Sequence, residues 1–168
     1  MSPTLFHTLR QGTKSYRAGL LQAKVYRLLK VTTAQLLKPD GISTLDWALL
    51  GILADHRRGM QSKSLAAKLG VDAAFITVLV RALETQGLLT RSVDQHDRRI
   101  KIITLTRAGQ SFVKRTDVRL RKGIRPLLRG ISAKDLSTYL QVLIHIERNG
   151  GSIRTAHFAQ DVELKLSQ

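Results

Sequence analysis

The chain has 168 residues, of which 28 are Lys or Arg and 12 are Asp or Glu, so its formal charge is +16. Its composition, 43% apolar and 24% charged, is typical of a globular protein and excludes wholesale disorder. The absence of Cys excludes disulfide scaffolds, thiolate zinc sites and Cys nucleophiles. No apolar run approaches the roughly 18 residues of a membrane span, and the N-terminus lacks the apolar centre of a signal peptide. We therefore expect a soluble cytoplasmic protein.

The positive charge predicts a polyanionic partner, nucleic acid in the first place and an acidic membrane surface in the second. Residues 1–60 hold nine basic and three acidic residues, and residues 107–130 hold eight basic residues and one acidic. Residues 61–106 hold only seven basic against four acidic residues. A disordered basic tail would concentrate the charge at one terminus, so we assign the charge to folded segments.

Helical periodicity dominates the first half of the chain. Apolar residues that recur every three or four positions predict four helices, at about 15–37, 44–56, 62–69 and 73–87. Pro39-Asp40-Gly41 breaks the first helix and Gly70 closes the third, while Asp72 can cap the fourth. This order of elements predicts a helical region that precedes a tight pair of short helices.

The second half begins with a different pattern. Residues 88–93 and 100–105 are rich in β-branched side chains and flank a polar segment, which predicts a β-hairpin. Two helices should follow, at about 107–130, with a kink at Pro126, and at 132–148, where Gly150-Gly151 ends the second. Residues 151–168 either form a short helix from about 155 to 166 or fray, and the sequence leaves both open.

The run Leu65-Ala66-Ala67-Lys68-Leu69-Gly70-Val71 has the spacing of a helix-turn-helix. The small Ala66 lets the second helix cross closely, and Gly70 supplies the sharp turn. Any tight helix pair needs such residues, but the hairpin directly after it favours a winged helix, with one helix in the major groove and the hairpin at the minor groove or backbone.

The sequence resembles the MarR/SlyA family of transcriptional regulators. Besides the helix-turn-helix, the resemblance rests on three runs: Leu83-Glu84-Thr85-Gln86-Gly87-Leu88-Leu89-Thr90-Arg91, Asp94-Gln95-His96-Asp97-Arg98-Arg99 and Leu105-Thr106-Arg107-Ala108-Gly109. It implies a mainly α fold with a small β-hairpin wing. Residues 44–106 would be the winged helix-turn-helix DNA-binding domain, and residues 1–43 and 107–168 would form a helical dimerisation domain.

By resemblance, the recognition helix would contact DNA through a set of six residues: Ala73, Ala74, Phe75, Thr77, Val78 and Arg81. Apolar side chains can touch a thymine methyl group or let the backbone approach phosphate, but they cannot make the bidentate contact of Arg with guanine. Thr77 and Arg81 are then the main polar readers, and base specificity is modest. Phe75 and Val78 fit plain packing equally well. The other predicted DNA contacts outside the wing tip are Ser62, Lys63, Arg91 and Lys101.

The wing tip carries Arg98 and Arg99 beside Asp97. A guanidinium group fits the narrow, strongly negative minor groove of A·T-rich DNA. By resemblance Arg99 reads this groove, and Asp97 holds the Arg99 side chain in an extended pose. The alternative is a solvated turn with an incidental ion pair.

The helix from Arg107 is two-faced. At 100° per residue, one arc of about 120° collects its cations: Arg115, Arg119, Lys122, Arg125 and Arg129. This stripe could meet phosphate, an acidic ligand or a partner, or be solvated.

The resemblance further implies an effector pocket between the two domains, with candidates Tyr16, Arg17, Trp47, His56 and Arg115. Aromatic walls with a cation suit a phenolic or carboxylate ligand, although a lone Trp on an apolar face is also common in cores. The five His residues lack metal-ligand spacing, so we expect no metal or other cofactor. Motifs of phosphate loops, nucleophile elbows and zinc proteases are missing, so we expect no enzyme.

The sequence therefore predicts a homodimeric DNA-binding regulator, a repressor released from a pseudo-palindromic operator by a small ligand. The alternative from another class is a winged-helix module that binds RNA or a protein without operator specificity. The apolar start of the recognition helix keeps this alternative open.

Overall fold

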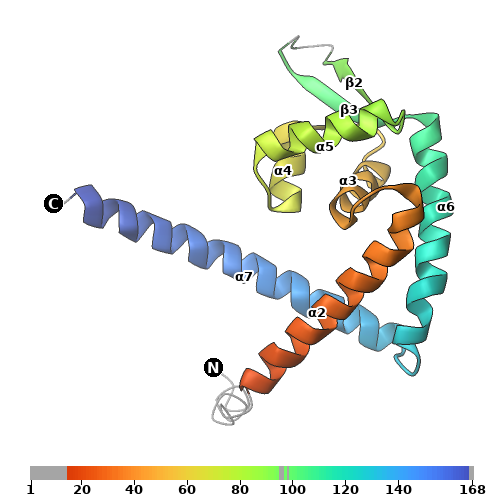
Figure 1. The fold of residues 1–168 in the computed structure, drawn as a ribbon. Coiled ribbons are helices and arrows are strands. Elements are labelled where there is room, and N and C mark those ends of the chain that lie inside the picture. Colours follow the sequence, from red (N-terminus) through yellow and green to blue (C-terminus); the bar gives the residue numbers. More distant parts are fainter. Residues whose placement is uncertain (1–14, 95–96, 98, 167–168) are drawn as a thin grey trace. The chain divides into compact units, whose positions relative to one another are not determined.

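The fold of the computed structural model is mainly α-helical with one small antiparallel sheet, as predicted (Figure 1). The structure describes residues 15–94, 97 and 99–166, and for residues 15, 16, 18 and 151–166 it describes the backbone alone. The helices and strands of the described residues are α2 (Ser15–Leu37), η2 (Lys38–Asp40), α3 (Thr44–Asp55), β1 (Met60–Gln61), α4 (Ser62–Leu69), α5 (Ala73–Thr85), β2 (Leu89–Val93), β3 (Lys101–Leu105), α6 (Arg107–Ile124), η3 (Arg125–Leu128) and α7 (Ala133–Leu166). Among them, no helix is both long enough and apolar enough to cross a membrane.

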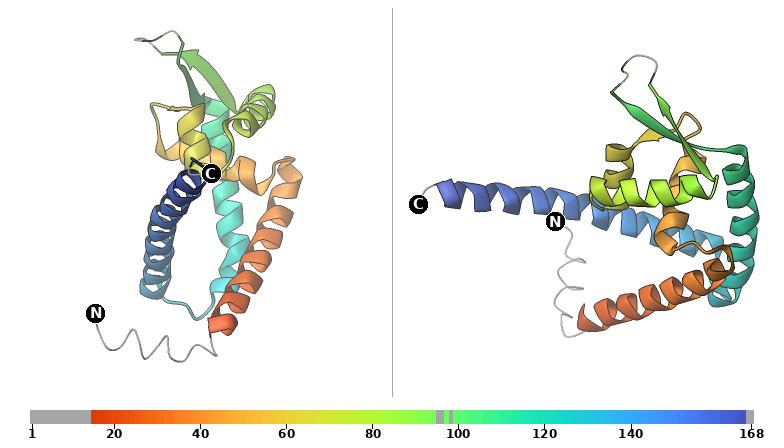
Figure 2. Two further views of the ribbon diagram at one scale, coloured as in Figure 1. Left: turned by 90° about the vertical axis from the view of Figure 1, so that its left-hand side faces the viewer. Right: turned by 45° about the horizontal axis from the view of Figure 1, so that its top comes forward.

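The chain divides into two compact units, Met1–Pro126 and Leu127–Gln168. In the first unit, α3, α4 and α5 lie against a sheet with the strand order β1-β3-β2 (Figure 2). Ile103 at the centre of β3 pairs with Met60 of β1 and Arg91 of β2. The predicted hairpin is therefore present. β1 was not predicted, because a strand of two residues has no alternation to detect.

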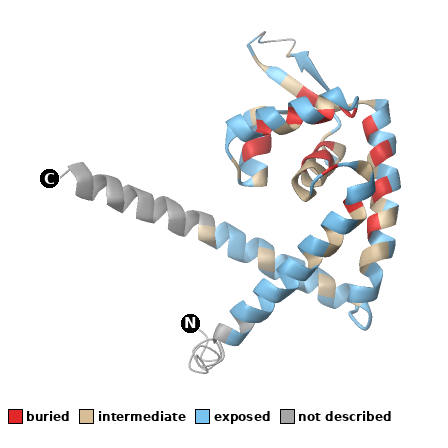
Figure 3. Ribbon diagram, viewed as in Figure 1, coloured by how far each residue is buried: buried red, intermediate tan, exposed pale blue. Residues whose placement is uncertain are grey.

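The hydrophobic core lies where the three short helices meet the sheet (Figure 3). Fully buried side chains come from every one of these elements: Leu49, Leu50, Leu65, Ile76, Val80, Leu83 and Ile103. Leu37 at the end of α2 and Phe112 and Leu120 of α6 extend this core beyond the winged-helix lobe, which we define as residues 44–106. The lobe is thus attached to α2 and α6 through buried apolar contacts rather than through linkers alone.

Local signals set the ends of the first helices. Ser43 caps α3 in a capping box, since its Oγ accepts the N–H of Asp46 at 3.1 Å while the Asp46 carboxylate accepts the N–H of Ser43 at 2.8 Å. Gly70 ends α4 in the left-handed conformation, with φ of 66°. The predicted ranges of α2 and α4 are confirmed.

Two predictions for the C-terminal helices are wrong. The helix expected at 107–130 ends at Ile124, and Arg125–Leu128 form a 3-10 turn because Pro126 has no N–H for a helical hydrogen bond. The helix expected to stop at Gly150-Gly151 continues to Leu166. Gly150 has no positive φ there, so it accepts the helical backbone at a cost of about 1 kcal/mol relative to Ala instead of ending the helix.

Candidate nucleic-acid interface

The helix-turn-helix consists of α4, the turn at Gly70 and α5. The N–H of Val71 donates to the carbonyl of Ala66 at 3.1 Å, which closes the turn, and Ala66 is only 6% exposed. A larger side chain at Ala66 would push the two helices apart. The structure therefore confirms that Ala66 allows the close helix crossing and that Gly70 supplies the turn.

The face of α5 opposite the core carries the residues predicted to recognise DNA. Ile76, Val80 and Leu83 are fully buried, and the six predicted contact residues lie exposed on the remaining surface: Ala73, Ala74, Phe75, Thr77, Val78 and Arg81. Phe75 and Val78 are 46% and 63% exposed, so neither packs into the core. The hydroxyl of Thr77 donates to the carbonyl of Ala73 at 3.2 Å, which leaves its lone pairs available to an incoming donor. This surface is small, mostly apolar and carries one cation, Arg81.

Arg91 joins the recognition helix to the wing. Its guanidinium forms an ion pair with the carboxylate of Glu84, which stands at the end of α5. The hydrogen bond from Arg91 lowers the pKa of Glu84, and the same contact raises the pKa of Arg91. Arg91 was predicted as a DNA contact. In the structure its guanidinium is already paired with the carboxylate of Glu84.

Two hydrogen bonds join the described residues of the wing tip. The carboxylate of Asp97 accepts the backbone N–H of Arg99 at 2.8 Å, and Asp97 in turn donates its own N–H to Asp94 at 3.2 Å. In the described residues Asp97 thus holds the backbone at Arg99 rather than its guanidinium. Arg99 is exposed, whereas Arg98 lies outside the described residues.

The remaining predicted DNA contacts lie around this surface. Lys63 is exposed on the first turn of α4 beside the half-buried Ser62, and Lys101 is exposed at the start of β3.

Thr106 and Gly109 lock the wing to α6. Thr106 donates its hydroxyl to the carbonyl of Gly87 at 2.7 Å, accepts the N–H of Gly109 at 2.9 Å and donates its own N–H to Leu88 at 3.1 Å. A Cβ at Gly109 would overlap the carbonyl oxygen of Leu88. In the sequence, Thr106 and Gly109 stood out only as members of the run from Leu105 to Gly109 that resembles the family. Their contacts explain why both residues are needed at this junction.

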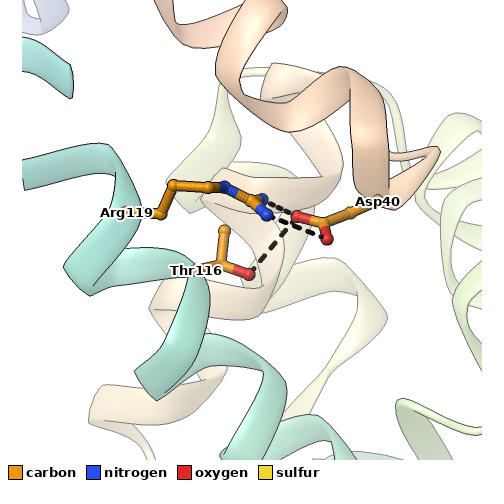
Figure 4. Close-up of polar contacts among 3 residues, drawn as sticks. All are labelled: Asp40, Thr116 and Arg119. Carbon is orange, nitrogen blue, oxygen red and sulfur yellow. Dashed lines mark hydrogen bonds and ion pairs between the residues drawn. The ribbon is translucent and has the colours of Figure 1, made fainter. Parts of the chain in front are cut away.

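A second polar cluster ties η2 to α6 (Figure 4). Asp40 forms an ion pair with Arg119, whose Nη1 also donates to Asp40 Oδ1 at 3.3 Å, and the hydroxyl of Thr116 lies 3.4 Å from Oδ2. The Asp40 side chain is only 13% exposed. The sequence placed Arg119 on a common basic stripe, but it lies against Asp40 instead.

A groove lies where α3 ends and α6 begins. It measures about 360 Å³, and its lining residues are Leu53, Ala54, Arg57, Leu105, Gln110, Val113 and Lys114. Two of them are cations and none is acidic, so its electrostatics favour an anion with an apolar body.

None of the five predicted effector residues lines this groove. Trp47 packs against the hydrophobic core, and His56 caps α3 with its Nδ1 bonded to the carbonyl of Ile52 at 2.7 Å. Arg115 lies over the ring of Phe112, 5.7 Å from its centre, and Arg17 is exposed on α2. The side chain of Tyr16 lies outside the described residues. The groove residues were missed because they are ordinary apolar and basic residues whose proximity only the fold creates.

The comparison with known proteins agrees with this geometry. The model of the MarR family matches residues 40–100, which cover the winged-helix lobe up to the start of β3. A MarR-family transcriptional regulator from Rhodococcus sp. RHA1 is 25% identical, with a TM-score of 0.71 over 79% of this chain and 93% of its own. Residues 40–100 thus match the MarR family, and the fold of the chain is that of a MarR-family transcriptional regulator.

Two further MarR-like structures carry bound partners. CouR from Rhodococcus jostii RHA1, bound to p-coumaroyl-CoA, is 26% identical, with a TM-score of 0.71 over 77% of this chain and 90% of its own. MepR of S. aureus in complex with DNA is 23% identical and shares the fold, with a TM-score of 0.67 over 78% of this chain and 96% of its own. The match to the MarR family and the likeness to its regulators support a DNA-binding transcriptional regulator, and they disfavour the RNA- or protein-binding alternative.

Proposed function

We propose that this MarR-family protein is a homodimeric repressor, which binds a pseudo-palindromic operator and leaves it when a small anionic ligand binds. Residues 44–106 would contact DNA, and the helices of residues 1–43 and 107–168 would form the dimer through their apolar faces. The observation that carries the proposal is the exposed face of α5 beside a wing whose described residues Arg99 and Lys101 are exposed cations. A dimer that occupies duplex DNA at a promoter blocks polymerase, which is the simplest route to repression.

In this proposal α5 enters the major groove. Thr77 and Arg81 would contact base edges, while Phe75 and Val78 would meet thymine methyl groups. Because only Arg81 on this face can make a bidentate contact with guanine, direct readout alone gives modest specificity. The wing would supply the rest, with Arg99 in the adjacent minor groove, where narrow A·T-rich sequences attract a guanidinium.

The proposed dimer follows from apolar surface that one chain leaves uncovered. On α2, five side chains that are 36–63% exposed share an arc of about 140°: Leu20, Leu21, Val25, Leu28 and Val31. Within the second unit, α7 exposes a further five: Tyr139, Leu140, Val142, Ile144 and Ile146. Stripes this long on a soluble chain need a partner surface, and a second copy supplies the same stripes in return.

The groove between α3 and α6 supports the ligand part of the proposal. A volume of about 360 Å³ suits a small molecule, and Arg57 and Lys114 can bind a carboxylate while Val113 contacts an apolar body. CouR, to which the chain is similar, is bound to p-coumaroyl-CoA, which joins a phenol to anionic phosphates, and this supports a ligand with an aromatic body and negative charge. A ligand that binds better to the DNA-free arrangement of α3 and α6 would release the operator.

A gel shift with duplex DNA from upstream of the gene tests the core of the proposal. We expect a shift that depends on sequence, and we expect Arg99→Ala to weaken it by about tenfold or more, the range of one lost base contact. Arg129→Ala is the matched control, because it removes the same exposed charge outside the lobe. Absence of a shift at low salt, or a shift indifferent to both sequence and Arg99, would refute the proposal.

A further inference from the structure

The largest concentration of positive charge lies on residues that take no part in the proposed operator contact. α6 and the following Arg125 hold seven basic residues and one acidic residue. The buried side of α6 carries Phe112, Thr116 and Leu120. On the opposite side an arc of about 100° holds five exposed cations, which we call the outer face of α6: Arg107, Lys114, Arg115, Lys122 and Arg125.

Pairing within the protein removes only part of this charge. Arg119 is neutralised by Asp40 and Arg121 by Asp117, at 2.8 Å. Among the described residues, no acidic side chain pairs with any of the five cations of the outer face. Like charges at this spacing repel each other, so an approaching anion lowers the electrostatic free energy of the surface.

The outer face extends away from the operator-binding surface. α6 begins beside β3 at the base of the wing and runs in the direction opposite to the wing tip, in all views of the first unit (Figures 1 and 2). Its 18 residues span about 27 Å. A straight duplex placed against α5 and the wing would therefore reach only the start of α6, whereas Lys122 and Arg125 lie at the far end.

We propose that the outer face of α6 binds the phosphate backbone of a second DNA duplex, so that the protein can bridge two DNA segments. The proposal rests on the proposed operator binding for the first duplex. Duplex DNA matches the surface by charge alone, since it offers one phosphate per roughly 1.7 Å of axis. An acidic protein fits less well, because Val118 is the one exposed large apolar residue described between these cations and no aromatic anchor accompanies it.

A bridging assay with the full chain tests this proposal. Operator duplex is fixed to beads, the protein is added, and retention of a labelled duplex of unrelated sequence is measured. The test variant is Lys122→Gln with Arg125→Gln, which leaves the groove residue Lys114 and both ion pairs in place. The control, Lys30→Gln with Lys38→Gln, removes the same charge from exposed positions on α2 and η2 that lie outside the apolar stripe of α2. Thermal melting and operator gel shifts establish that both variants fold and bind.

We expect the wild type and the control to retain the second duplex, and the test variant to retain about tenfold less. The slope of log affinity against log salt for unrelated duplex should become shallower by about 1.8, or 0.9 for each lost phosphate contact. Equal retention by all three proteins, or no retention by a wild type that binds its operator, would overturn the proposal. A protein that fails to bind operator contradicts the proposed function instead, and the salt slope then still decides whether the outer face binds DNA.

Discussion

Thr106 and Gly109 occupy the point where the chain leaves the wing and enters α6. The contacts of Thr106 require a hydroxyl group, and the contact of Gly109 leaves no room for a Cβ. Thr106 supplies a donor to Gly87 and an acceptor to Gly109 from one hydroxyl group. Gly109 lets the helix approach the carbonyl of Leu88 without a Cβ between them. The direction of the wing, and so the position of Arg99, depends on this junction.

We expect Gly109→Ala to lower the free energy of unfolding by about 1–3 kcal/mol, because the new methyl group overlaps the carbonyl of Leu88 and the backbone must shift. Gly19→Ala is the matched control, since Gly19 lies in α2 with nothing within 4 Å, and it should be neutral or stabilise by up to about 1 kcal/mol. Urea denaturation measures both. Equal stability of the two variants would mean that the approach of α6 to the wing is not tight.

At the scale of elements, α6 organises the first unit, because it contacts both the wing and the end of α2. The Thr106 junction fixes its N-terminal end, and the ion pair between Asp40 and Arg119 fixes it to η2. η2 separates α2, proposed for the dimer, from the lobe proposed for DNA. A change in the contact of η2 with α6 therefore changes how the lobe is held on the rest of the protein.

Removal of one partner of this pair leaves the other charge in a partly desolvated position. We expect Asp40→Ala and Arg119→Ala each to destabilise the protein by about 1–3 kcal/mol, and the double variant by less than the sum of the two. The exposed pair of Asp117 and Arg121 on the same helix is the control, and it should couple by only about 0.3–0.5 kcal/mol. A double-mutant cycle by urea denaturation compares the two couplings, and equal values would contradict a special role for Asp40.

Elements were predictable from the sequence where a local signal marks their ends. Gly70 defines the end of α4, and the hydrophobic period of α5 defines which of its residues face outward, so the exposure of the six proposed contact residues was predictable. Long-range contacts were not predictable, because Asp40 and Arg119 are 79 positions apart and no local pattern joins them. The stop predicted at Gly150 was wrong because Gly permits a helical end without requiring one.

At the scale of the whole molecule, charge and apolar surface are separated along the chain. The exposed cations of the described lobe are spread over several elements, whereas the outer face of α6 gathers five within one arc, and the apolar stripe of α2 carries only scattered charge. Since a dimer doubles the charge of +16 on each chain, its attraction for DNA is broad and long-ranged. Selection of a site then depends on the few side chains of α5 and the wing.

The dimer is the assumption on which operator symmetry depends, and the apolar stripe of α2 provides its test. We expect a mass of twice 18.7 kDa in sedimentation equilibrium, and Leu28→Glu should yield monomers because it places a charge within the stripe. The monomer should also bind operator at least about tenfold more weakly, since two half-sites are no longer held together. Gln22→Glu adds the same charge to the same helix about 120° away from Leu28 and should remain dimeric. A wild type that is monomeric at micromolar concentration, or dimers of Leu28→Glu as stable as those of Gln22→Glu, would assign the stripe to another partner.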